Sequence, residues 1–381
     1  MKNGYKMTEI GVIPVDWEVN TFKNICWVNQ GLQIPIEKRL KYPTIKSKKY
    51  ITIQYLNDGK AIEYIDDYSL SVCCKTEEVL MTRTGNTGVV ITDVEGVFHN
   101  NFFKINFDKK RVNREFLIYY LKDTKTQKII LEKAGTSTIP DLNHNDFYSI
   151  KIPIPPLPEQ KAIAEVLSDT DNLIQAIEKR IAKKRLIKQG AMQKLLSPKD
   201  DWEVKKLGEI AELKMGQSPS SSNYNNSGIG LPLVQGNADI KNRETIIRNY
   251  TSQITKKCNT GDIIMSVRAP VGEIARAIFK ACIGRGVCAI FYPNNFLYHY
   301  LIFIEPQWAK HSTGSTFDSV NSDAIRELEI PFPSKQEQTH IATILSDMDS
   351  EIEALEKKRA KYQLLKQGLM QNLLTGKIRL I

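Results

Sequence analysis

One long amphipathic segment occurs twice in this chain, and this repeat constrains the fold more than any other feature. Residues 152–197 align without a gap on residues 330–375, at a constant offset of 178, and 25 of the 46 aligned positions are identical. Both copies have the apolar periodicity of a long helix, and each follows a longer, less regular stretch of chain. The sequence therefore predicts two similar halves, each a globular body followed by a helical rod.

The repeat divides the chain into four segments. We expect a first body over residues 1–150, a first rod over 151–198, a second body over 199–328, and a second rod with a short tail over 329–381. The two bodies repeat each other faintly, because each opens on Asp-Trp-Glu-Val, beginning at Asp16 and at Asp201.

Short runs rich in Val, Ile, Tyr and Phe between Gly, Asn and Pro indicate that the bodies contain many strands. The predicted strands include 49–56, 88–92, 97–107, 262–267 and 287–292, whereas residues 113–133 and 294–311 predict helices. The expected fold class is α+β, with two β-rich α/β domains separated by the two long helices.

The apolar positions of the rods alternate at spacings of three and four residues, which is typical of a coiled-coil seam. Both seams are narrow and nearly identical, and covalent linkage raises their effective concentration. We therefore expect an antiparallel intramolecular coiled coil with pseudo-two-fold symmetry. The alternative is that each rod pairs with a rod of another chain. The seam positions are Ile163, Leu167, Ile174, Ile177 and Ile181 in the first rod, and Ile341, Leu345, Met348, Ile352 and Leu355 in the second.

The composition favours a polyanionic partner. The chain of 381 residues carries a formal net charge of +10, with a sequence pI of about 9.1, and such an excess favours nucleic acid through counterion release. The six cysteines form no C-x-x-C pair, so we expect reduced thiols in a cytoplasmic protein. No apolar run approaches the length of a membrane span, and no secretory signal precedes the first body, so no membrane partner is expected.

Motifs of catalysis are missing from the sequence. It has no phosphate-binding P-loop, no H-E-x-x-H, no G-x-S-x-G and no Asn-Pro-Pro-aromatic or Asp-Pro-Pro-aromatic tetrapeptide of an amino-methyltransferase. We expect no catalytic residue, metal site or cofactor in this chain. One alternative is a stand-alone Mg²⁺-dependent nuclease, because Asp141, Glu159 and Lys161 match the loose pattern P-D…E-x-K. A second alternative is a coiled-coil interaction protein that does not bind DNA.

Two matching segments offer side chains suited to reading bases. Arginine suits bidentate contact with guanine, and asparagine suits adenine. Arg83 with Thr84 and Asn86, and Arg268 in the matching segment, follow predicted strands. We therefore expect these residues to read DNA, although a solvated surface arginine is the ordinary alternative.

Further residues suit phosphate contacts. Two hydroxyl-rich loops end the bodies, and their hydroxyl and N–H groups suit contacts that set register on the duplex, although a capped turn would look the same. The basic run from Lys179 to Lys188 on the first rod is either a solvated face or a border to DNA or an acidic partner. The remaining DNA-binding candidates are Thr136, Ser137, Thr138, Ser315 and Thr316 in those loops, and Lys46, Lys48, Lys49, Arg243, Arg248 and Arg285 elsewhere.

Several segments resemble the specificity (S) subunits of type I restriction-modification systems. Residues 8–19 (TEIGVIPVDWEV) resemble that family's N-terminal signature. The segment 314–321, the IPFP at 330–333 and the EQTHIATIL at 337–345 resemble the junction of its recognition domains with its conserved helices. Residues 373–380 (LLTGKIRL) are similar to the family's C-terminus. These motifs occur in order along nearly the whole chain.

The resemblance implies two target-recognition domains, each reading one half of a split, asymmetric site in double-stranded DNA. It implies that the two helices set the gap between the half-sites and dock two modification (methyltransferase) subunits, with up to two restriction subunits as further partners. S-adenosylmethionine, ATP and Mg²⁺ would then belong to the partner subunits, and this chain would carry no catalytic centre.

Overall fold

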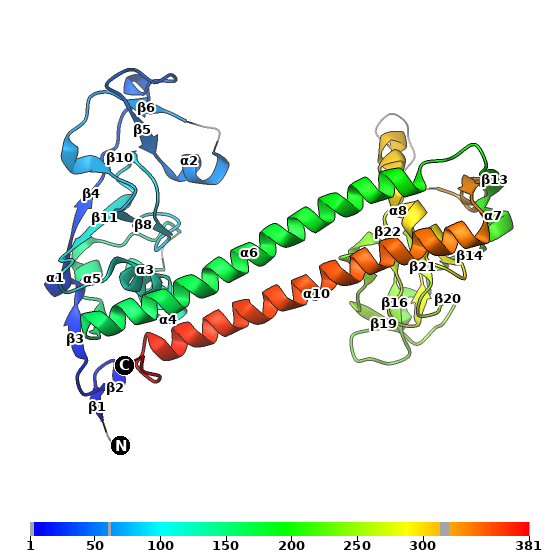
Figure 1. Cartoon of the computed structure of the whole chain (residues 1–381). Coiled ribbons are helices and arrows are strands. Elements are labelled where there is room, and N and C mark those ends of the chain that lie inside the picture. The colour runs from blue at the N-terminus through cyan, green and yellow to red at the C-terminus, as the bar shows by residue number, and fades with distance from the viewer. Residues whose placement is uncertain (1–3, 60–61, 137, 313–319, 381) are drawn as a thin grey trace. The chain divides into compact units, whose positions relative to one another are not determined.

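The computed structural model describes residues 4–59, 62–136, 138–312 and 320–380 of the chain (Figure 1). It contains two compact units, of which unit 1 comprises Met1–Ile177 with Lys358–Ile381 and unit 2 comprises Glu178–Lys357. Each unit holds one body and one part of each long helix, α6 (Leu157–Leu196) and α10 (Lys335–Leu373). The four-segment division along the chain stays a prediction, because the compact units cut through both helices.

Unit 1 is built on two four-stranded sheets. The first has the order β4-β11-β8-β9 and packs against α1, α3, α4 and α5. The second has the order β6-β5-β10-β7, and α2 contacts its inner strand β5. A hairpin of β1 and β2 precedes them, and β3 pairs antiparallel with β12 just before α6. The strands are β1 (Tyr5–Thr8), β2 (Gly11–Pro14), β3 (Glu18–Thr21), β4 (Cys26–Gln30), β5 (Lys48–Ile51), β6 (Tyr64–Ile65), β7 (Cys73–Cys74), β8 (Val79–Thr82), β9 (Val90–Ile91), β10 (Gly96–Phe98), β11 (Phe102–Phe107) and β12 (Lys151–Ile154), and the helices are α1 (Phe22–Ile25), α2 (Ile53–Asp58), α3 (Arg114–Lys122), α4 (Thr124–Ala134) and α5 (His144–Tyr148).

Unit 2 has the same arrangement, but its two main sheets contain more strands. A six-stranded sheet has the order β14-β24-β21-β22-β18-β17, and a five-stranded sheet has the order β15-β19-β16-β23-β20. The strand pair β13–β25 precedes α10 as β3–β12 precedes α6. The strands are β13 (Glu203–Lys206), β14 (Glu212–Met215), β15 (Tyr224–Asn225), β16 (Leu231–Val234), β17 (Ile240–Lys241), β18 (Glu244–Thr245), β19 (Asn249–Thr251), β20 (Lys257–Cys258), β21 (Ile263–Ser266), β22 (Ile274–Arg276), β23 (Ala281–Ile283), β24 (Val287–Phe291) and β25 (Glu329–Phe332), and the helices are α7 (Leu207–Ile210), α8 (Phe296–Ser312) and α9 (Ser322–Arg326).

The internal repeat is clearer in the topology than in the body sequences. In each unit one parallel strand pair, β5–β10 or β16–β23, lies beside an antiparallel strand, β7 or β20. In each unit the strand that follows a short helix, β4 after α1 and β14 after α7, pairs antiparallel with the last long strand of the body, β11 or β24. The two bodies therefore share one frame.

The hydrophobic core of each body includes the beginning of one long helix. In unit 1, Ile163 and Leu167 of α6 are buried with Trp17 and Phe116, and Leu373 near the end of α10 joins them. In unit 2 the matching residues Ile341 and Leu345 of α10 are buried with Trp202 and Phe296, and Leu196 at the end of α6 joins them. The rods are thus part of the body cores and not free-standing extensions.

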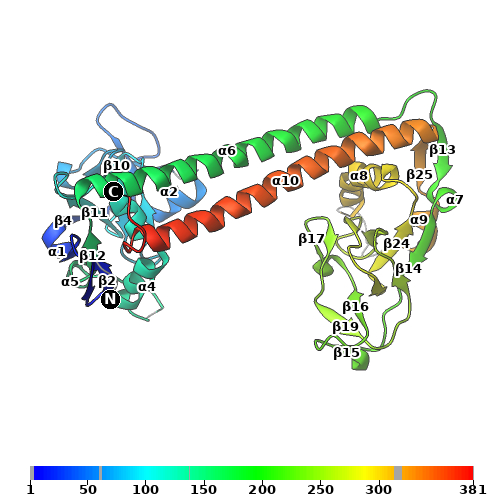
Figure 2. The ribbon, with the colours of Figure 1, turned by 60° about the horizontal axis from the view of Figure 1, so that its bottom comes forward.

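Within each unit, the segments of α6 and α10 lie side by side and run antiparallel (Figures 1 and 2). In unit 1 the Lys366 ammonium lies 2.6 Å from the Asp171 carboxylate. In unit 2, Lys184 lies 2.6 Å from Glu351, and Lys188, one turn later in α6, pairs with Asp349, which precedes Glu351 in α10. The expected antiparallel pairing within the chain is confirmed. Ile163, Leu167, Ile174, Ile177, Ile181, Ile341, Leu345 and Ile352 are buried, and Met348 and Leu355 are half-buried.

Three local predictions were wrong in detail. The helix predicted over 113–133 is two helices, α3 and α4, because Asp123 is extended and its side chain caps α4. The strand predicted over 49–56 ends at Ile51, because Thr52 accepts a hydrogen bond from the Tyr55 backbone N–H at 3.1 Å and so caps α2. The strand predicted over 97–107 is two strands, β10 and β11, with a turn at residues 99–101 between them.

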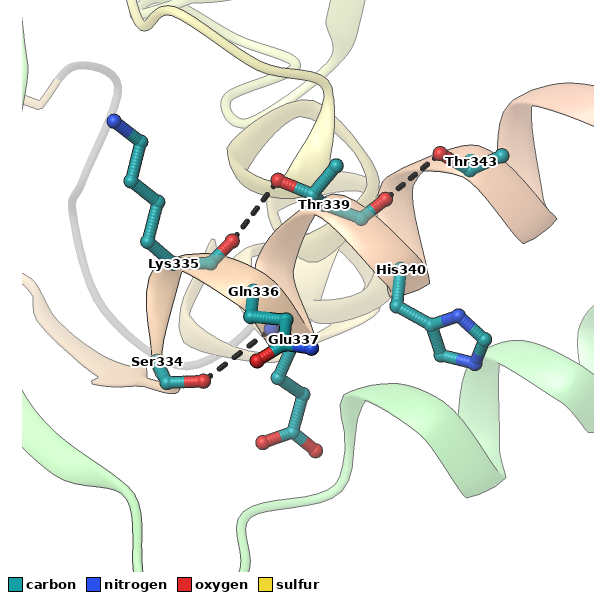
Figure 3. Close-up of a pocket in the computed structure, with 7 residues that line it drawn as sticks. All are labelled: Ser334, Lys335, Gln336, Glu337, Thr339, His340 and Thr343. Carbon is teal, nitrogen blue, oxygen red and sulfur yellow. Dashed lines mark hydrogen bonds between the residues drawn. The ribbon is translucent and has the colours of Figure 1, made fainter.

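The start of α10 is capped by Ser334, whose hydroxyl accepts the Glu337 backbone N–H at 3.3 Å (Figure 3). The Glu337 carboxylate points away from the helix and binds Trp202 Nε1 at 3.2 Å and the Lys199 ammonium. Only one half of a capping box is formed here, since the Glu337 carboxylate instead anchors the body of unit 2 to the helix. In the described part of the chain, no helix is both long and apolar enough to cross a membrane.

Candidate nucleic-acid interface

Three loops meet at the equivalent place in each unit, and we call each group a loop cluster. In unit 1 the cluster consists of the β8–β9 loop (residues 83–89), the β10–β11 turn (99–101) and the residues that follow β4 (31–33). In unit 2 it consists of the β21–β22 loop (267–273), the β23–β24 turn (284–286) and the residues that follow β14 (216–218).

The backbone hydrogen bonds that hold the two loop clusters are the same. The N–H of Arg83 donates to Asn101 at 2.7 Å, and the N–H of Val267 donates to Gly286 at 2.9 Å. The carbonyl oxygens of the same two residues accept from Leu142 at 2.8 Å and from Val320 at 2.9 Å. Each loop is thereby fixed on two sides, which pre-organises its exposed tip.

Close backbone contact also requires glycine at one point of each cluster. A Cβ atom on Gly31 would lie 2.2 Å from the carbonyl oxygen of Phe98, and a Cβ atom on Gly216 would lie 2.1 Å from that of Gly284. A side chain at either position would push the loops apart. The loop clusters are therefore tightly built on the shared frame.

The exposed side chains at the tips differ between the units. Asn86 is exposed at the tip of the unit 1 loop, and Arg268 is exposed on the matching loop of unit 2. Arg285 is exposed on the neighbouring turn of unit 2, where its backbone N–H binds the Ser218 hydroxyl at 3.1 Å. Within the residues that the structure describes, the Arg268 and Arg285 guanidinium groups have no hydrogen-bond or ion-pair partner. These two cations suit guanine or phosphate, whereas the Asn86 amide suits adenine.

Arg83 is placed differently from what the sequence suggests, since its guanidinium is engaged within the protein. It lies 2.7 Å from the Asp141 carboxylate and 3.2 Å from the carbonyl oxygen of Leu142, and it stacks on the Phe103 ring at 5.3 Å. The side chain is only 14% exposed. Its equivalent in unit 2 is the buried Val267, so this position supports the loop. A base contact by Arg83 would first have to break these bonds.

The other sequence-predicted residues fall into two groups. Several are engaged within the protein: Thr84 donates to Asp141, Lys48 lies 3.2 Å from Glu95, Arg243 pairs with Glu305, and Arg248 lies 3.8 Å from Asp239. Others are exposed, namely Lys46, Lys49, Thr136 and Thr138. Ser137, Ser315 and Thr316 lie outside the described residues. The sequence reasoning also missed polar residues in the clusters, namely Gln33, His99 and Asn100 in unit 1 and Gln217 and Ser218 in unit 2.

A signal for the position of Arg83 was present in the sequence. When residues 79–88 are aligned on 263–272, Arg83 falls opposite Val267 and Arg268 falls opposite Thr84. A position that holds valine in one copy is a packing position, so the alignment indicates Arg268 rather than Arg83 as the exposed arginine. The missed polar residues carry no comparable signal, because only the strand pairing brings them to the loops.

The basic run on α6 also has partners within the protein. Lys184 and Arg180 approach Glu351, Arg185 pairs with Glu356, and Lys188 pairs with Asp349, all within unit 2. Four of the six cations of the run are therefore paired with acidic residues of α10, whereas Lys179 and Lys183 are exposed and have no ion pair among the described residues.

The residues of the nuclease pattern have separate roles in unit 1. Glu159 is buried and accepts hydrogen bonds from Trp17 Nε1 at 2.8 Å and from Arg379 at 2.6 Å, and its carboxylate raises the pKa of Arg379. Asp141 instead binds Arg83 and Thr84. Among the described residues, no group of three or more His, Cys, Asp or Glu side chains is placed to hold a metal ion. Glu159 anchors α6 to the body, as Glu337 anchors α10.

Comparisons with known proteins agree with this geometry. The family model described as the type I restriction modification DNA specificity domain matches the chain twice, at residues 14–184 and 199–363. Two relatives come from Methanocaldococcus jannaschii and are described as specificity subunits of the type I restriction enzymes MjaX and MjaVIII. The first is 33% identical over 99% of this chain and 97% of its own length, and the second is 27% identical over 96% and 94%.

Solved structures share the fold. A chain in a structure of a type I restriction-modification system has a TM-score of 0.61 at 23% identity, covering 96% of this chain and 99% of its own. The type I restriction-modification S subunit from M. genitalium has a TM-score of 0.63 at 18% identity, covering 98% and 99%.

This chain belongs to the family of type I restriction-modification DNA specificity subunits. Its role is that of the DNA-recognition component, which works with methyltransferase and restriction subunits and is not itself the catalytic part. This assignment supports the main hypothesis from the sequence and neither of the two alternatives, the stand-alone nuclease and the interaction protein without DNA binding.

Proposed function

We propose that unit 1 and unit 2 each read one half of a bipartite, asymmetric site in double-stranded DNA, and that the loop clusters are the reading elements. The observation that carries the proposal is that the same hydrogen-bonded frame occurs twice with different exposed side chains at its tips. A shared frame presents both tips in the same manner, while the different tips give different sequence preferences.

In this proposal the exposed tips of the loop clusters read bases, and the surrounding residues contact the DNA backbone. Asn86 reads an adenine in the half-site of unit 1, and Arg268 with Arg285 reads a guanine in the half-site of unit 2. Lys46, Lys49, Thr136 and Thr138, which are exposed, contact phosphates. Arg83 is assigned a positioning role, because its bonds to Asp141 and Leu142 hold the loop that carries Asn86.

The paired helices set the gap between the two half-sites. Each is a single helix of 40 or 39 residues, and the ion pairs Lys366–Asp171 and Lys188–Asp349 fix the register of their antiparallel pairing. These two pairs are equivalent under the offset of 178, so the same contact is made once in each unit.

Two modification subunits dock on the helices, one at each of two equivalent apolar patches. Leu186 and Ile187 of α6 are 69% and 46% exposed, and the matching Leu364 and Leu365 of α10 are 70% and 49% exposed. Adjacent apolar side chains left in water on a charged helix suit a protein interface. S-adenosylmethionine belongs to these subunits, whereas ATP and Mg²⁺ belong to the restriction subunits, up to two of which join the complex.

Methylome sequencing of a host carrying this chain with its cognate modification subunit tests the proposal. Asn86→Ala should weaken the base preference at one position of one half-site, and Arg268→Ala should weaken it at one position of the other half-site. Each variant should lose about 1–3 kcal/mol of discrimination between bases. Both residues are exposed, so the variants should fold normally. Relaxation of the same half-site by both variants, or an even loss over all sequences, would contradict the assignment.

A further inference from the structure

Unit 1 contains a basic segment, residues 36–49, which follows β4 and ends within β5 and which the loop clusters do not include. Two of its cations are engaged, because Arg39 lies 3.0 Å from Glu63 and Lys48 lies 3.2 Å from Glu95. The others are exposed and, in the part of the chain that the structure describes, have no ion-pair partner. They are Lys38, Lys41, Lys46 and Lys49.

Three large apolar side chains of the same segment are exposed. Ile36 is 72% exposed, Tyr42 is 81% exposed, and Ile45 is 106% exposed, as much as in an extended chain. Ile45 occupies the tip of an ordered turn, because the Thr44 N–H donates to the Ser47 hydroxyl at 2.7 Å and the Ser47 N–H donates to the Thr44 hydroxyl at 3.2 Å. Tyr68 holds the far side of the turn through a bond from its hydroxyl to the Lys46 carbonyl oxygen at 3.0 Å. The turn presents Ile45 rigidly to solvent.

We propose that this turn enters the major groove of the half-site read by unit 1, where Ile45 contacts the C5-methyl group of a thymine and the flanking lysines contact phosphates. The inference rests on the proposed function and adds a specificity-determining residue to it. A thymine methyl is the one apolar feature of the base edges in the major groove, so an aliphatic side chain at the tip of a turn with lysines nearby matches it.

The charge of the segment favours DNA over a protein as the partner that Ile45 contacts. A protein partner that covered these apolar side chains would also have to cover four unpaired lysines, and lysine is depleted at the centres of protein interfaces. A wedge between base pairs would enter from the minor groove and would have to separate stacked bases. Contact with a methyl group requires no such deformation.

Unit 2 has a different segment at the equivalent place, between β14 and β16. Residues 217–229 (QSPSSSNYNNSGI) contain no lysine or arginine. Within it, the Asn225 side-chain oxygen accepts backbone N–H bonds from Ser227 at 3.2 Å and Ile229 at 3.0 Å. The methyl contact should therefore affect one half-site only, which the methylome of Asn86→Ala identifies.

The test measures binding of the full-length chain, in complex with its modification subunit, to duplexes bearing the methylome-defined site. Each thymine of the unit 1 half-site is replaced in turn by deoxyuridine, which removes only the methyl group. One replacement should weaken binding about fivefold, Ile45→Ala should weaken binding to the unmodified duplex equally, and the two changes together should weaken it no further. Lys46→Ala should instead weaken binding to all sequences and lower the slope of log K against log salt by about one. Val204→Ala, an exposed apolar residue on β13 of unit 2, is the matched control and should have no effect.

Three results would overturn the inference: wild-type affinity for Ile45→Ala, full additivity of that variant with every deoxyuridine replacement, or an even loss over all sequences, as a wedge would give. Because Ile45 is fully exposed, the Ile45→Ala variant should unfold at the same temperature as the wild-type chain. A folding defect can therefore be distinguished from a loss of DNA contact. Failure of the wild-type complex to bind its site would overturn the proposed function itself, which is a separate outcome.

Discussion

Two glutamates anchor the long helices to the bodies in the same way but contribute differently to stability. Glu159 and Glu337 both accept a hydrogen bond from a tryptophan of the adjoining body and both pair with a cation. The Glu159 side chain is fully buried, whereas the Glu337 side chain is 23% exposed and its partner Lys199 is 52% exposed. Water can replace Lys199 but cannot reach Glu159.

We therefore predict that Arg379→Ala destabilises unit 1 by about 3–5 kcal/mol, because it leaves a buried carboxylate without its cation. Lys199→Ala at the equivalent place should destabilise unit 2 much less, since exposed ion pairs contribute little. Hydrogen exchange of the full-length chain, read separately for peptides of each unit, measures both. A loss for Arg379→Ala no larger than that for Lys199→Ala would show that the Glu159 pair is not the stronger anchor.

His299 of α8 should make unit 2 sensitive to acid. Its side chain is 1% exposed, and burial, with Lys188 and Arg276 nearby, lowers its pKa from 6.5 to about 3. Asp349 lies 3.9 Å from Nδ1 but is engaged by Lys188, and Nε2 lies 3.2 Å from the Ser346 hydroxyl. The unfolded chain therefore binds a proton at His299 more readily than the folded chain at any pH below 6.5.

This contribution to stability is complete above pH 6.5 and is lost as the pH falls from 6.5 toward 3, by about 2 kcal/mol at pH 5. Urea unfolding at pH 8 and pH 5, compared between the wild-type chain and His299→Gln, measures it. The variant should lose about 2 kcal/mol less than the wild-type chain over this interval. Equal losses in the two proteins would contradict the assignment of a neutral, buried histidine.

At the scale of elements, the sequence predicted what depends on local pattern. The periodicity of Ile163, Leu167, Ile341 and Leu345 identified both helices and their buried faces, because burial of a helix face follows from spacing along the chain. The repeat also predicted that the two helices pair, since two matching apolar seams in one chain can pack against each other.

What depends on long-range contacts was not predictable in the same way. The partner of Arg83 is Asp141, which reaches it only because the bridge between Thr84 and Asp141 brings the two segments together. Likewise the basic run of α6 resembles an open DNA-binding face until the acidic residues of α10 lie beside it. Residue type alone does not distinguish a free cation from a paired one.

The apolar patches of the helices give a prediction about assembly. Leu364→Asp should remove one of the two modification subunits, Leu186→Asp should remove the other, and the double variant should bind neither, because a carboxylate in each patch opposes burial against a partner. Native mass spectrometry of the purified complex counts the subunits. Val204→Asp is the control and should retain both, because Val204 is 62% exposed but lies on a strand of unit 2. Loss of both subunits from either single variant would argue against two independent docking patches.

At the scale of the whole molecule, duplication accounts for the proposed reading of an asymmetric site by one chain. The frames of the two bodies are equivalent down to the loop hydrogen bonds, while the tips and the segments after β4 and β14 differ in charge and side chain. The helical segments are the most similar parts of the two halves, with 25 of 46 positions identical. This similarity is expected, because both halves depend on the length and the pairing of the helices. Sequence preference and spacing are thus assigned to separate parts of the chain.

Matched insertions into both helices test this separation most directly. Seven residues that continue the seam, inserted after Ile177 in α6 and after Lys357 in α10, lengthen the paired helices by about 10 Å. Because base pairs are spaced about 3.4 Å apart along the duplex, the gap between the half-sites in the host methylome should increase by about three base pairs while both half-sites remain unchanged. An unchanged gap, or altered bases within either half-site, would contradict the account.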